Sequence, residues 1–102
     1  MTEIPGVIMA VFLVEYTYPP EKLPLRDEHR PAHRAWLSEQ VDAGRMLIAG
    51  PLTDGSGGLF LVRGDDADST REFVAADPFQ QVGGVSAVRV QEWTPVFGPF
   101  TA

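Results

Sequence analysis

Apolar side chains recur along the chain with two different periods, and these periods predict four strands and two helices. Residues 7–16 (VIMAVFLVEY) are rich in β-branched and aromatic side chains and stop before two nearby prolines, which is typical of a strand. Residues 46–52 and 59–63 predict two more strands, joined by a turn whose strongest signal is Asp54-Gly55. Residues 85–93 alternate well enough to predict the fourth strand.

The first helix is predicted to start between residues 27 and 31 and to end at Gly44. Proline is acceptable only in the first turn of a helix, so Pro31 marks the start, and glycine suits the position after the last turn. The preceding residues 17–26 contain three prolines and predict a loop. The inward face of this helix, at positions i, i+3, i+4, i+7 and i+8, consists of His33, Trp36, Leu37, Gln40 and Val41.

The second helix is predicted over residues 67–76. Asp68 or Ser69 would cap its start, and Pro78 would end it because the residue before a proline avoids helical angles. Asp77 is therefore expected at the end of this helix, and residues 79–84 predict a loop.

The resulting order of elements is β-α-β-β-α-β, the ferredoxin-like α+β pattern, in one domain with a core over residues 7–93 and a tail over 94–102. Right-handed crossovers place both helices on one face of a four-stranded antiparallel sheet. The other face should be apolar as well, because residues 7–14 and 59–62 are apolar at both alternating sets of positions. A second copy packed sheet to sheet is the simplest cover, so we expect a homodimer of the dimeric α+β barrel type.

Composition removes several classes of function. The chain holds 14 acidic and 8 basic residues, a net charge of −6, which disfavours binding to nucleic acid. It has no cysteine, which excludes disulfides, thiolate metal sites and a cysteine nucleophile. No segment approaches the ~20 apolar residues of a membrane span, and no signal peptide is recognisable. We expect a cytoplasmic protein that binds neither nucleic acid nor membranes.

The predicted topology brings His33 and Asp77 to the same end of the molecule. The two helices run antiparallel, so the start of the first lies near the end of the second, beside the tip of the hairpin over residues 46–63. A carboxylate that accepts from one imidazole nitrogen makes the other nitrogen a better base. The alternative is structural, with His33 a satisfied core residue and Asp77 bonded to backbone groups at a helix end.

Several short motifs, in this order and spacing, resemble the YCII (YciI-like) family over roughly residues 7–93. They are Arg30-x-x-His33, Gly50-Pro51, Gly58 and the triplet Asp77-Pro78-Phe79. The resemblance implies a small dimeric protein with a ferredoxin-like α+β fold and an active site built on a His–Asp dyad, which falls on His33 and Asp77. It also implies that Arg30 lies near this site. One branch of the family includes a dehydrochlorinase of a chlorinated hydroxyhydroquinone, and most members have no assigned reaction.

Arg30 and the glycine-rich hairpin are the candidates for holding a ligand. Arg30 lies three residues before His33 and so can share its helix face, where it would bind a substrate carboxylate or phenolate. The alternative is a solvated arginine paired with a nearby acid. Gly50, Pro51 and Ser56 belong to a hairpin that leaves room for a small ligand, anionic or aromatic. This hairpin opens onto a strand and lacks the helix dipole of a phosphate-binding loop.

The predicted function is that of a small enzyme that needs no cofactor. His33 and Asp77 would act as general acid and base in the elimination or isomerisation of a small organic acid or phenol. No metal is expected, because Pro31 interrupts the i, i+4 pair of His29 and His33 and no third ligand is evident. Two alternatives stay open: a non-catalytic ligand-binding or regulatory dimer that uses the same pocket, and a purely structural dimer with a buried histidine.

Overall fold

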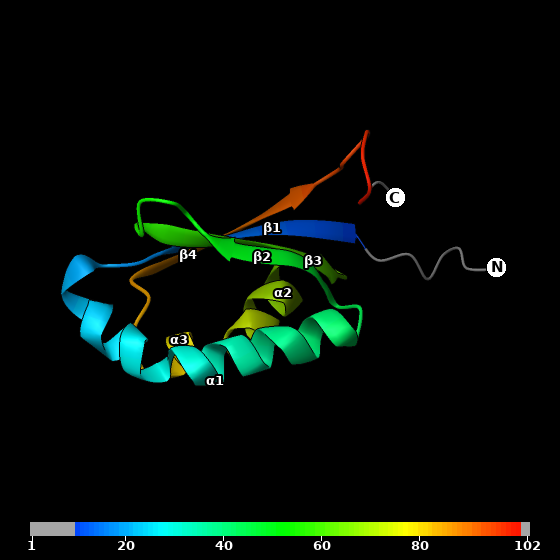
Figure 1. The fold of residues 1–102 in the computed structure, drawn as a ribbon. Helices are drawn as coiled ribbons and strands as arrows, with labels where there is room; N and C mark the ends of the chain where they lie inside the picture. Colours follow the sequence, from blue (N-terminus) through cyan, green and yellow to red (C-terminus); the bar gives the residue numbers. More distant parts are fainter. Residues whose placement is uncertain (1–9, 101–102) are drawn as a thin grey trace.

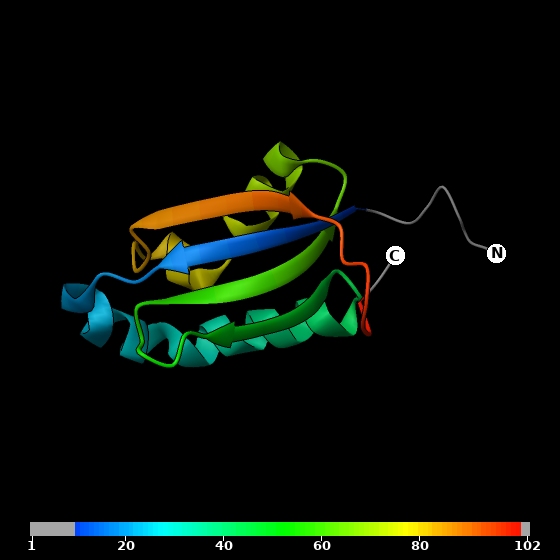
Figure 2. The ribbon, with the colours of Figure 1, turned by 90° about the horizontal axis from the view of Figure 1, so that it is seen from above.

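The helices of the chain gather on one face of a four-stranded antiparallel sheet (Figure 1). The computed structural model describes residues 10–100, so residues 7–9 of the predicted first strand and residues 101–102 of the predicted tail lie outside the described part. The strands are β1 (Ala10–Thr17), β2 (Met46–Pro51), β3 (Gly57–Gly64) and β4 (Ala87–Trp93). They lie in the order β2-β3-β1-β4 (Figure 2), which confirms the predicted ferredoxin-like α+β fold.

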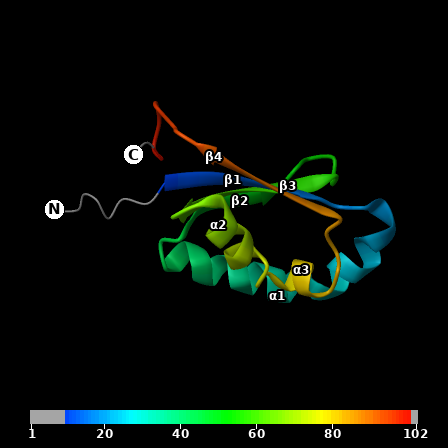
Figure 3. The same ribbon diagram turned by 180° about the vertical axis from the view of Figure 1, so that it is seen from behind.

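The helical layer begins with the 3-10 turn η2 (Pro20–Lys22) and the long helix α1 (Leu23–Asp42). The shorter helix α2 (Ala67–Val74) and the one-turn helix α3 (Pro78–Gln81) lie beside α1 under the sheet (Figure 3). α1 packs along β2 and against α3, whereas α2 packs beneath β3 and β4. Among the helices of residues 10–100, none is long and apolar enough to cross a membrane.

Helix α1 starts earlier than the sequence analysis predicted, so the prediction that Pro31 marks the start was wrong. Pro24 occupies the first turn, and Pro31 lies inside the helix. A proline there leaves the carbonyl of Asp27 without its helical donor, but both residues are exposed, so water can reach that carbonyl. The prediction that Val41 faces inward was also wrong, because its side chain is 45% exposed. Eight residues at about 100° each turn it roughly 80° away from His33.

The start of α2 and the position of Asp77 also differ from the prediction. Asp66, two residues before the nearer predicted cap, caps α2 by accepting from the Ser69 amide, and the Ser69 hydroxyl accepts from the Asp66 amide in return. Asp77 is not the last residue of α2. It caps α3, which forms in the segment predicted as a loop, and Pro78 then occupies the first position of α3, where its missing N–H is not needed.

The core fills the space between the sheet and the helices. Alternation along β1 turns Phe12, Val14 and Tyr16 toward the helices, and all three are buried. Phe60 on β3 packs its ring edge-on against that of Tyr16, with 4.6 Å between ring centres. This aromatic contact places a tyrosine hydroxyl beneath the sheet, next to the loop that holds Asp77.

The opposite face of the sheet is apolar, as predicted, and no described helix covers it (Figures 1 and 3). We call it the open sheet face and define it by five apolar side chains that line a shallow hollow of about 540 Å³, namely Leu13, Ile48, Leu59, Leu61 and Trp93. Gln91 and Glu92 also line this hollow. The face is not apolar throughout, because Glu15 and Arg89 form an exposed ion pair at 3.5 Å on neighbouring strands. Its apolar part lies on β2, β3, the first half of β1 and the end of β4 at Trp93.

Candidate active site

His33 and Asp77 meet at the end of the molecule where α1 and α3 pack together. The His33 Nδ1 atom lies 2.7 Å from Asp77 Oδ1. Both residues are buried, with exposures of 6% and 0%. The antiparallel arrangement of the helices produces this meeting, as the sequence analysis expected. Asp77 reaches His33 from the cap position of α3, and so the turn between α2 and α3 aims the carboxylate.

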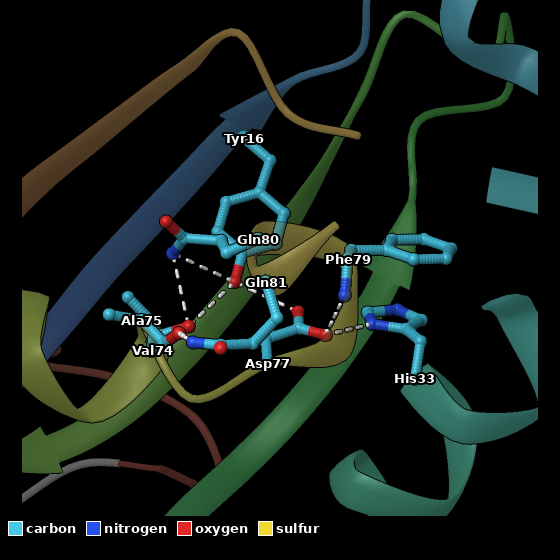
Figure 4. Close-up of polar contacts among 8 residues, drawn as sticks. All are labelled: Tyr16, His33, Val74, Ala75, Asp77, Phe79, Gln80 and Gln81. Carbon is cyan, nitrogen blue, oxygen red and sulfur yellow. Dashed lines mark hydrogen bonds and ion pairs between the residues drawn. The ribbon is translucent and has the colours of Figure 1, made fainter. Parts of the chain in front are cut away.

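The Asp77 carboxylate is held from three directions (Figure 4). Its Oδ1 atom also accepts from the backbone N–H of Phe79 at 2.9 Å, and its Oδ2 atom accepts from the Tyr16 hydroxyl at 2.9 Å. The Gln80 amide donates to the Tyr16 oxygen at 3.3 Å and to the Val74 carbonyl at 3.0 Å. The Tyr16 hydroxyl also lies 3.3 Å from the Val74 carbonyl, but Asp77 Oδ2 at 2.9 Å is the nearer and charged acceptor for its single proton.

These contacts fix which nitrogen of His33 carries the proton. An ionised carboxylate can only accept hydrogen bonds, so Nδ1 must donate to Asp77. The ring lies flat on Phe79, with 3.8 Å between ring centres and 2° between the planes. Within residues 10–100 the structure gives Nε2 no hydrogen-bond partner, and His33 lines a cavity of about 390 Å³. In a neutral ring that donates from Nδ1, the basic lone pair is on Nε2, the nitrogen without a partner in the described chain.

Tyr16 stays a neutral donor to this carboxylate. Burial, and after it the neighbouring Asp77 carboxylate, raise the pKa of Tyr16 well above its ordinary value of 10.0. The phenol therefore keeps its proton at physiological pH. The orientation of Asp77, and through it that of His33, depends on a hydroxyl supplied by the central strand β1.

The structure places the predicted ligand-binding residues as follows. Arg30, Gly50 and Pro51 line the cavity beside His33. Ser56 is exposed and is not among the lining residues, and its hydroxyl donates to Asp54 Oδ1 at 2.6 Å. Together with the Ser56 amide, this bond lowers the pKa of the Asp54 carboxyl below its ordinary value. Ser56 therefore serves the turn between β2 and β3 in this structure.

Arg30 lines the cavity and also makes the ion pair that was the alternative to ligand binding, whereas its role toward a ligand stays a prediction. Its Nη1 atom lies 2.6 Å from Asp27 Oδ1, which is the pairing that the sequence analysis named as the alternative. Its guanidinium carbon also lies 5.9 Å from the centre of the Phe79 ring, on the cavity side. Both partners of the ion pair are partly exposed, so the pair contributes little stability and can open.

Four residues of the site were missed from the sequence, namely Tyr16, Tyr18, Arg26 and Gln80. Arg26 is buried and lines the cavity, seven residues before His33. It lay in the segment predicted as a loop. With Pro24 as the helix start, the series 26, 30, 33 and 37 would have shown one helix face. Tyr16 continues the inward alternation of β1, but alternation does not reveal a hydrogen bond to a residue 61 positions away.

The residues of the described segment do not converge on a metal ion. No group of three or more histidine, cysteine, aspartate or glutamate side chains in residues 10–100 could hold one. His29 points its Nε2 atom toward Glu28 at 3.9 Å, whereas His33 is engaged with Asp77. The expectation that the protein needs no metal stays a prediction, which elemental analysis of the purified protein would test.

Comparisons with known proteins agree with the fold. Uncharacterized protein YjpA of Bacillus subtilis (strain 168) is 29% identical over 66 residues, which cover 65% of this chain and 76% of that protein. A solved structure of 5-chloro-2-hydroxyhydroquinone dehydrochlorinase (TftG) from Burkholderia phenoliruptrix AC1100, in complex with 2,5-dihydroxybenzoquinone, superposes with a TM-score of 0.71. It is 25% identical to this chain, covering 81% of this chain and 92% of that one. The sequence model of the YCII-related domain matches residues 9–94, and the chain therefore belongs to the YCII-related family.

Proposed function

We propose that the protein is a small-molecule enzyme in which His33 moves a proton and Asp77 orients it. The observation that carries this proposal is the 2.7 Å contact between two buried side chains, in which His33 also lines a cavity and its Nε2 atom has no hydrogen-bond partner within residues 10–100. A merely structural histidine would find a partner for both ring nitrogens in a packed core. The substrate is a small organic acid or phenol, and no cofactor takes part.

The step that this geometry supports is a proton transfer. Nε2 takes a proton from a carbon or oxygen of the substrate, and the electron pair that is released forms a new double bond. In an elimination this pair expels a leaving group, such as chloride, from another carbon, so that the substrate loses the proton and the leaving group together. In an isomerisation the proton returns from Nε2 to a different carbon. The Asp77 carboxylate stabilises the imidazolium that exists in between.

The solved dehydrochlorinase supports an elimination. That enzyme is named for a chlorinated hydroxyhydroquinone, and the molecule bound to it is 2,5-dihydroxybenzoquinone, a planar quinone. A cavity of about 390 Å³, walled by Phe60 and Phe79, suits a ligand of one ring. Dehydrochlorination of a chlorinated phenol is accordingly the first reaction to test.

The assembly that we propose is a homodimer joined through the open sheet face. Leu59 is 37% exposed there, and Ile48 and Trp93 are exposed beside it. Contiguous apolar side chains on one face mark a protein interface more often than a solvated surface. A second copy, packed sheet to sheet, would present the same face and remove both from water.

Turnover of a chlorinated phenol tests the proposed function. The substrate is 5-chloro-2-hydroxyhydroquinone, and the readouts are chloride release and exchange of substrate hydrogens for deuterium in D₂O. We expect His33→Gln to lower the rate on the order of 10²- to 10⁴-fold, the usual contribution of a general base. His29→Gln is the matched control, since this second histidine lies on the same helix but outside the cavity lining, and should keep full activity.

Two results would contradict the proposal. The first is a His33→Gln variant that is folded and as active as the wild type. The second is a wild-type protein that binds small phenols yet releases no chloride and exchanges no hydrogen across a panel of chlorinated and unsubstituted phenols and organic acids. That second result would instead favour the non-catalytic ligand-binding module.

A further inference from the structure

The cavity beside His33 is lined by positively charged side chains, although the protein as a whole is acidic. The protein has a net charge of −6, yet three of its 8 basic residues, Arg26, Arg30 and Arg34, line this cavity. None of the described lining residues is an aspartate or a glutamate. Low-dielectric walls strengthen such a field, so the cavity attracts anions even though the molecule as a whole repels them.

Arg26 is the buried member of this group and has no acidic partner. It is 3% exposed, and its Nη1 atom donates to the carbonyls of Pro19 and Gly84, both at 3.0 Å. Across residues 10–100 no carboxylate forms an ion pair with it, and the structure gives its Nε and Nη2 atoms no acceptor. Arg30, by contrast, is already paired with Asp27. A buried guanidinium without a counter-ion is costly, so an anion from outside the chain would stabilise it.

Tyr18 adds an unused hydroxyl next to Arg26. The guanidinium carbon of Arg26 lies 4.5 Å from the centre of the Tyr18 ring, and Tyr18 is only 9% exposed. In the described chain its backbone N–H bonds to the Ser56 carbonyl, but its hydroxyl has no hydrogen-bond partner. A buried hydroxyl in this state loses its hydration without compensation. Tyr18 also belongs to the residues that line the cavity, from which a ligand can supply the missing acceptor.

The backbone makes room for this hydroxyl. A Cβ atom placed on Gly58 would lie 2.9 Å from the Tyr18 oxygen, closer than such contacts occur. Any side chain at position 58 would therefore displace the hydroxyl. The absence of a side chain at Gly58 thus allows the Tyr18 hydroxyl to take its position.

We propose that Arg26 and the Tyr18 hydroxyl form an oxyanion-binding subsite, which takes a carboxylate or phenolate oxygen of the ligand whose other end faces His33. Arg26 precedes His33 by seven residues, about two helical turns or roughly 10 Å along the axis, a span that its own long side chain shortens. A one-ring ligand with an ionised oxygen on one side fits between the two. Arg30 gives secondary support, because it must first leave Asp27. The inference rests on the proposed function only in taking this ligand to be the substrate.

The phenol of Tyr18 is suited to donate to such an oxygen. Burial, followed by the Asp77 carboxylate, raises the pKa of Tyr18 to about 12 despite the opposing effect of the two arginines. At neutral pH it is a neutral donor beside a permanent cation. Donors of this kind together discriminate an ionised oxygen from an ether or amide oxygen.

Binding measurements with matched anionic and neutral probes test the subsite. The probes are 2,5-dihydroxybenzoquinone and benzoate, which are ionised at pH 7, and their neutral counterparts 2,5-dimethoxybenzoquinone and benzamide. Isothermal titration with the full-length protein should show at least one ionised probe binding tenfold or more tightly than its neutral counterpart. Tighter binding of the quinone would identify an ionised ring oxygen as the ligand group, and tighter binding of benzoate a carboxylate.

Variants then locate the subsite. Tyr18→Phe removes one oxygen and no existing bond, so it should fold normally and weaken the ionised probe about tenfold, the usual value of a hydrogen bond to a charged group. Arg26→Gln should weaken it further, with circular dichroism used to check the fold because Arg26 also holds two carbonyls. Arg34→Gln, on the same helix and cavity, should change affinity less than threefold.

The subsite is refuted if neither ionised probe binds the wild type, if the neutral probes bind equally well, or if Tyr18→Phe binds the ionised probe with unchanged affinity. These failures are distinct from a failure of the proposed function. Anion binding that depends on Tyr18 in a protein without turnover leaves the subsite standing and removes the catalytic role of His33. If the wild type turns over substrate and neither Tyr18→Phe nor Arg26→Gln changes KM or kcat, the catalytic role of His33 stands and the subsite is removed.

Discussion

The two faces of the sheet carry two hollows of different chemistry. The hollow on the open sheet face is the larger, at about 540 Å³, and its side chains are largely aliphatic or aromatic. The cavity on the helix side is smaller, at about 390 Å³, but holds His33 and three arginines. A mainly apolar hollow, with Gln91 and Glu92 as its polar lining residues, suits a protein surface, whereas convergent donors and a base suit a small ligand. Size therefore does not identify the candidate active site here, and the arrangement of polar atoms does.

The largest expected effect comes from placing a charge on the open sheet face. Leu59→Asp should convert a dimer into a monomer near 11.2 kDa, with affinity lowered on the order of a hundredfold or more, because a buried unpaired carboxylate is costly. Light scattering and sedimentation give the mass. Val41→Asp is the matched control, since this side chain is equally exposed but lies on α1. A wild type that is monomeric at micromolar concentration would remove the interface from the account.

The helix-side face should instead be sensitive to alkaline pH. The pKa of Tyr18 is about 12 in the folded protein and 10.0 as its ordinary value, and that of Tyr16 is raised further. A raised pKa gives stability that is complete below pH 10 and is lost as the pH rises toward 12, because the unfolded chain releases its proton first. Denaturant unfolding at pH 9 and pH 11 should differ by about 2–3 kcal/mol. Equal stability at both pH values would show that these phenols are not shielded.

Removing the Tyr16 hydroxyl should lower the free energy of unfolding more than removing the Tyr18 hydroxyl does. Tyr16→Phe takes one hydrogen bond from the Asp77 carboxylate and leaves the Gln80 amide without one acceptor, so we expect a loss of about 1–3 kcal/mol. Tyr18→Phe breaks no bond and should change the free energy of unfolding by less than about 0.5 kcal/mol. Urea denaturation at neutral pH measures both. Equal losses would mean that the two hydroxyls do not have the different roles assigned to them.

The smallest effect separates two glycines of the hairpin. Gly58→Ala pushes a methyl group against the Tyr18 oxygen and should cost about 1 kcal/mol and weaken binding of an anionic probe. Gly50→Ala meets nothing within 4 Å and should be tolerated. Thermal unfolding with and without benzoate or 2,5-dihydroxybenzoquinone compares them. If Gly58→Ala unfolds and binds as Gly50→Ala does, Tyr18 adjusts freely and its hydroxyl is not positioned by the hairpin.

The fold and the His33–Asp77 pair could be predicted from the sequence, because they depend on hydrophobic periodicity and on topology. Alternation gave the strands, and antiparallel helices brought His33 to Asp77. The start of α1 could not be predicted from the sequence, because either of two prolines, Pro24 and Pro31, could occupy the first turn. In the fold, packing of α1 along β2 outweighs the helical hydrogen bond lost at Pro31.

The missed site residues were out of reach for a related reason. Arg26 became a loop residue through the misplaced helix start, and nothing in its own neighbours shows that it lacks an acidic partner. Tyr16 bonds to Asp77, which is 61 positions away in the sequence. Gln80 bonds to Tyr16 across 64 positions. Such contacts follow from the packed geometry, which local patterns constrain only loosely.

The measurement closest to the central claim is the tautomer of His33, observed by ¹⁵N NMR at a pH where the ring is neutral. In a neutral ring, the hydrogen bond to an ionised Asp77 requires a protonated, pyrrole-like Nδ1 and a bare, pyridine-like Nε2. His29, which does not contact Asp77, is the internal reference in the same spectrum. We predict the Nδ1–H tautomer for His33 in the wild type and its loss in Asp77→Ala. A His33 ring with the proton on Nε2 in the wild type would contradict the account, because the cavity would then face a donor and no base.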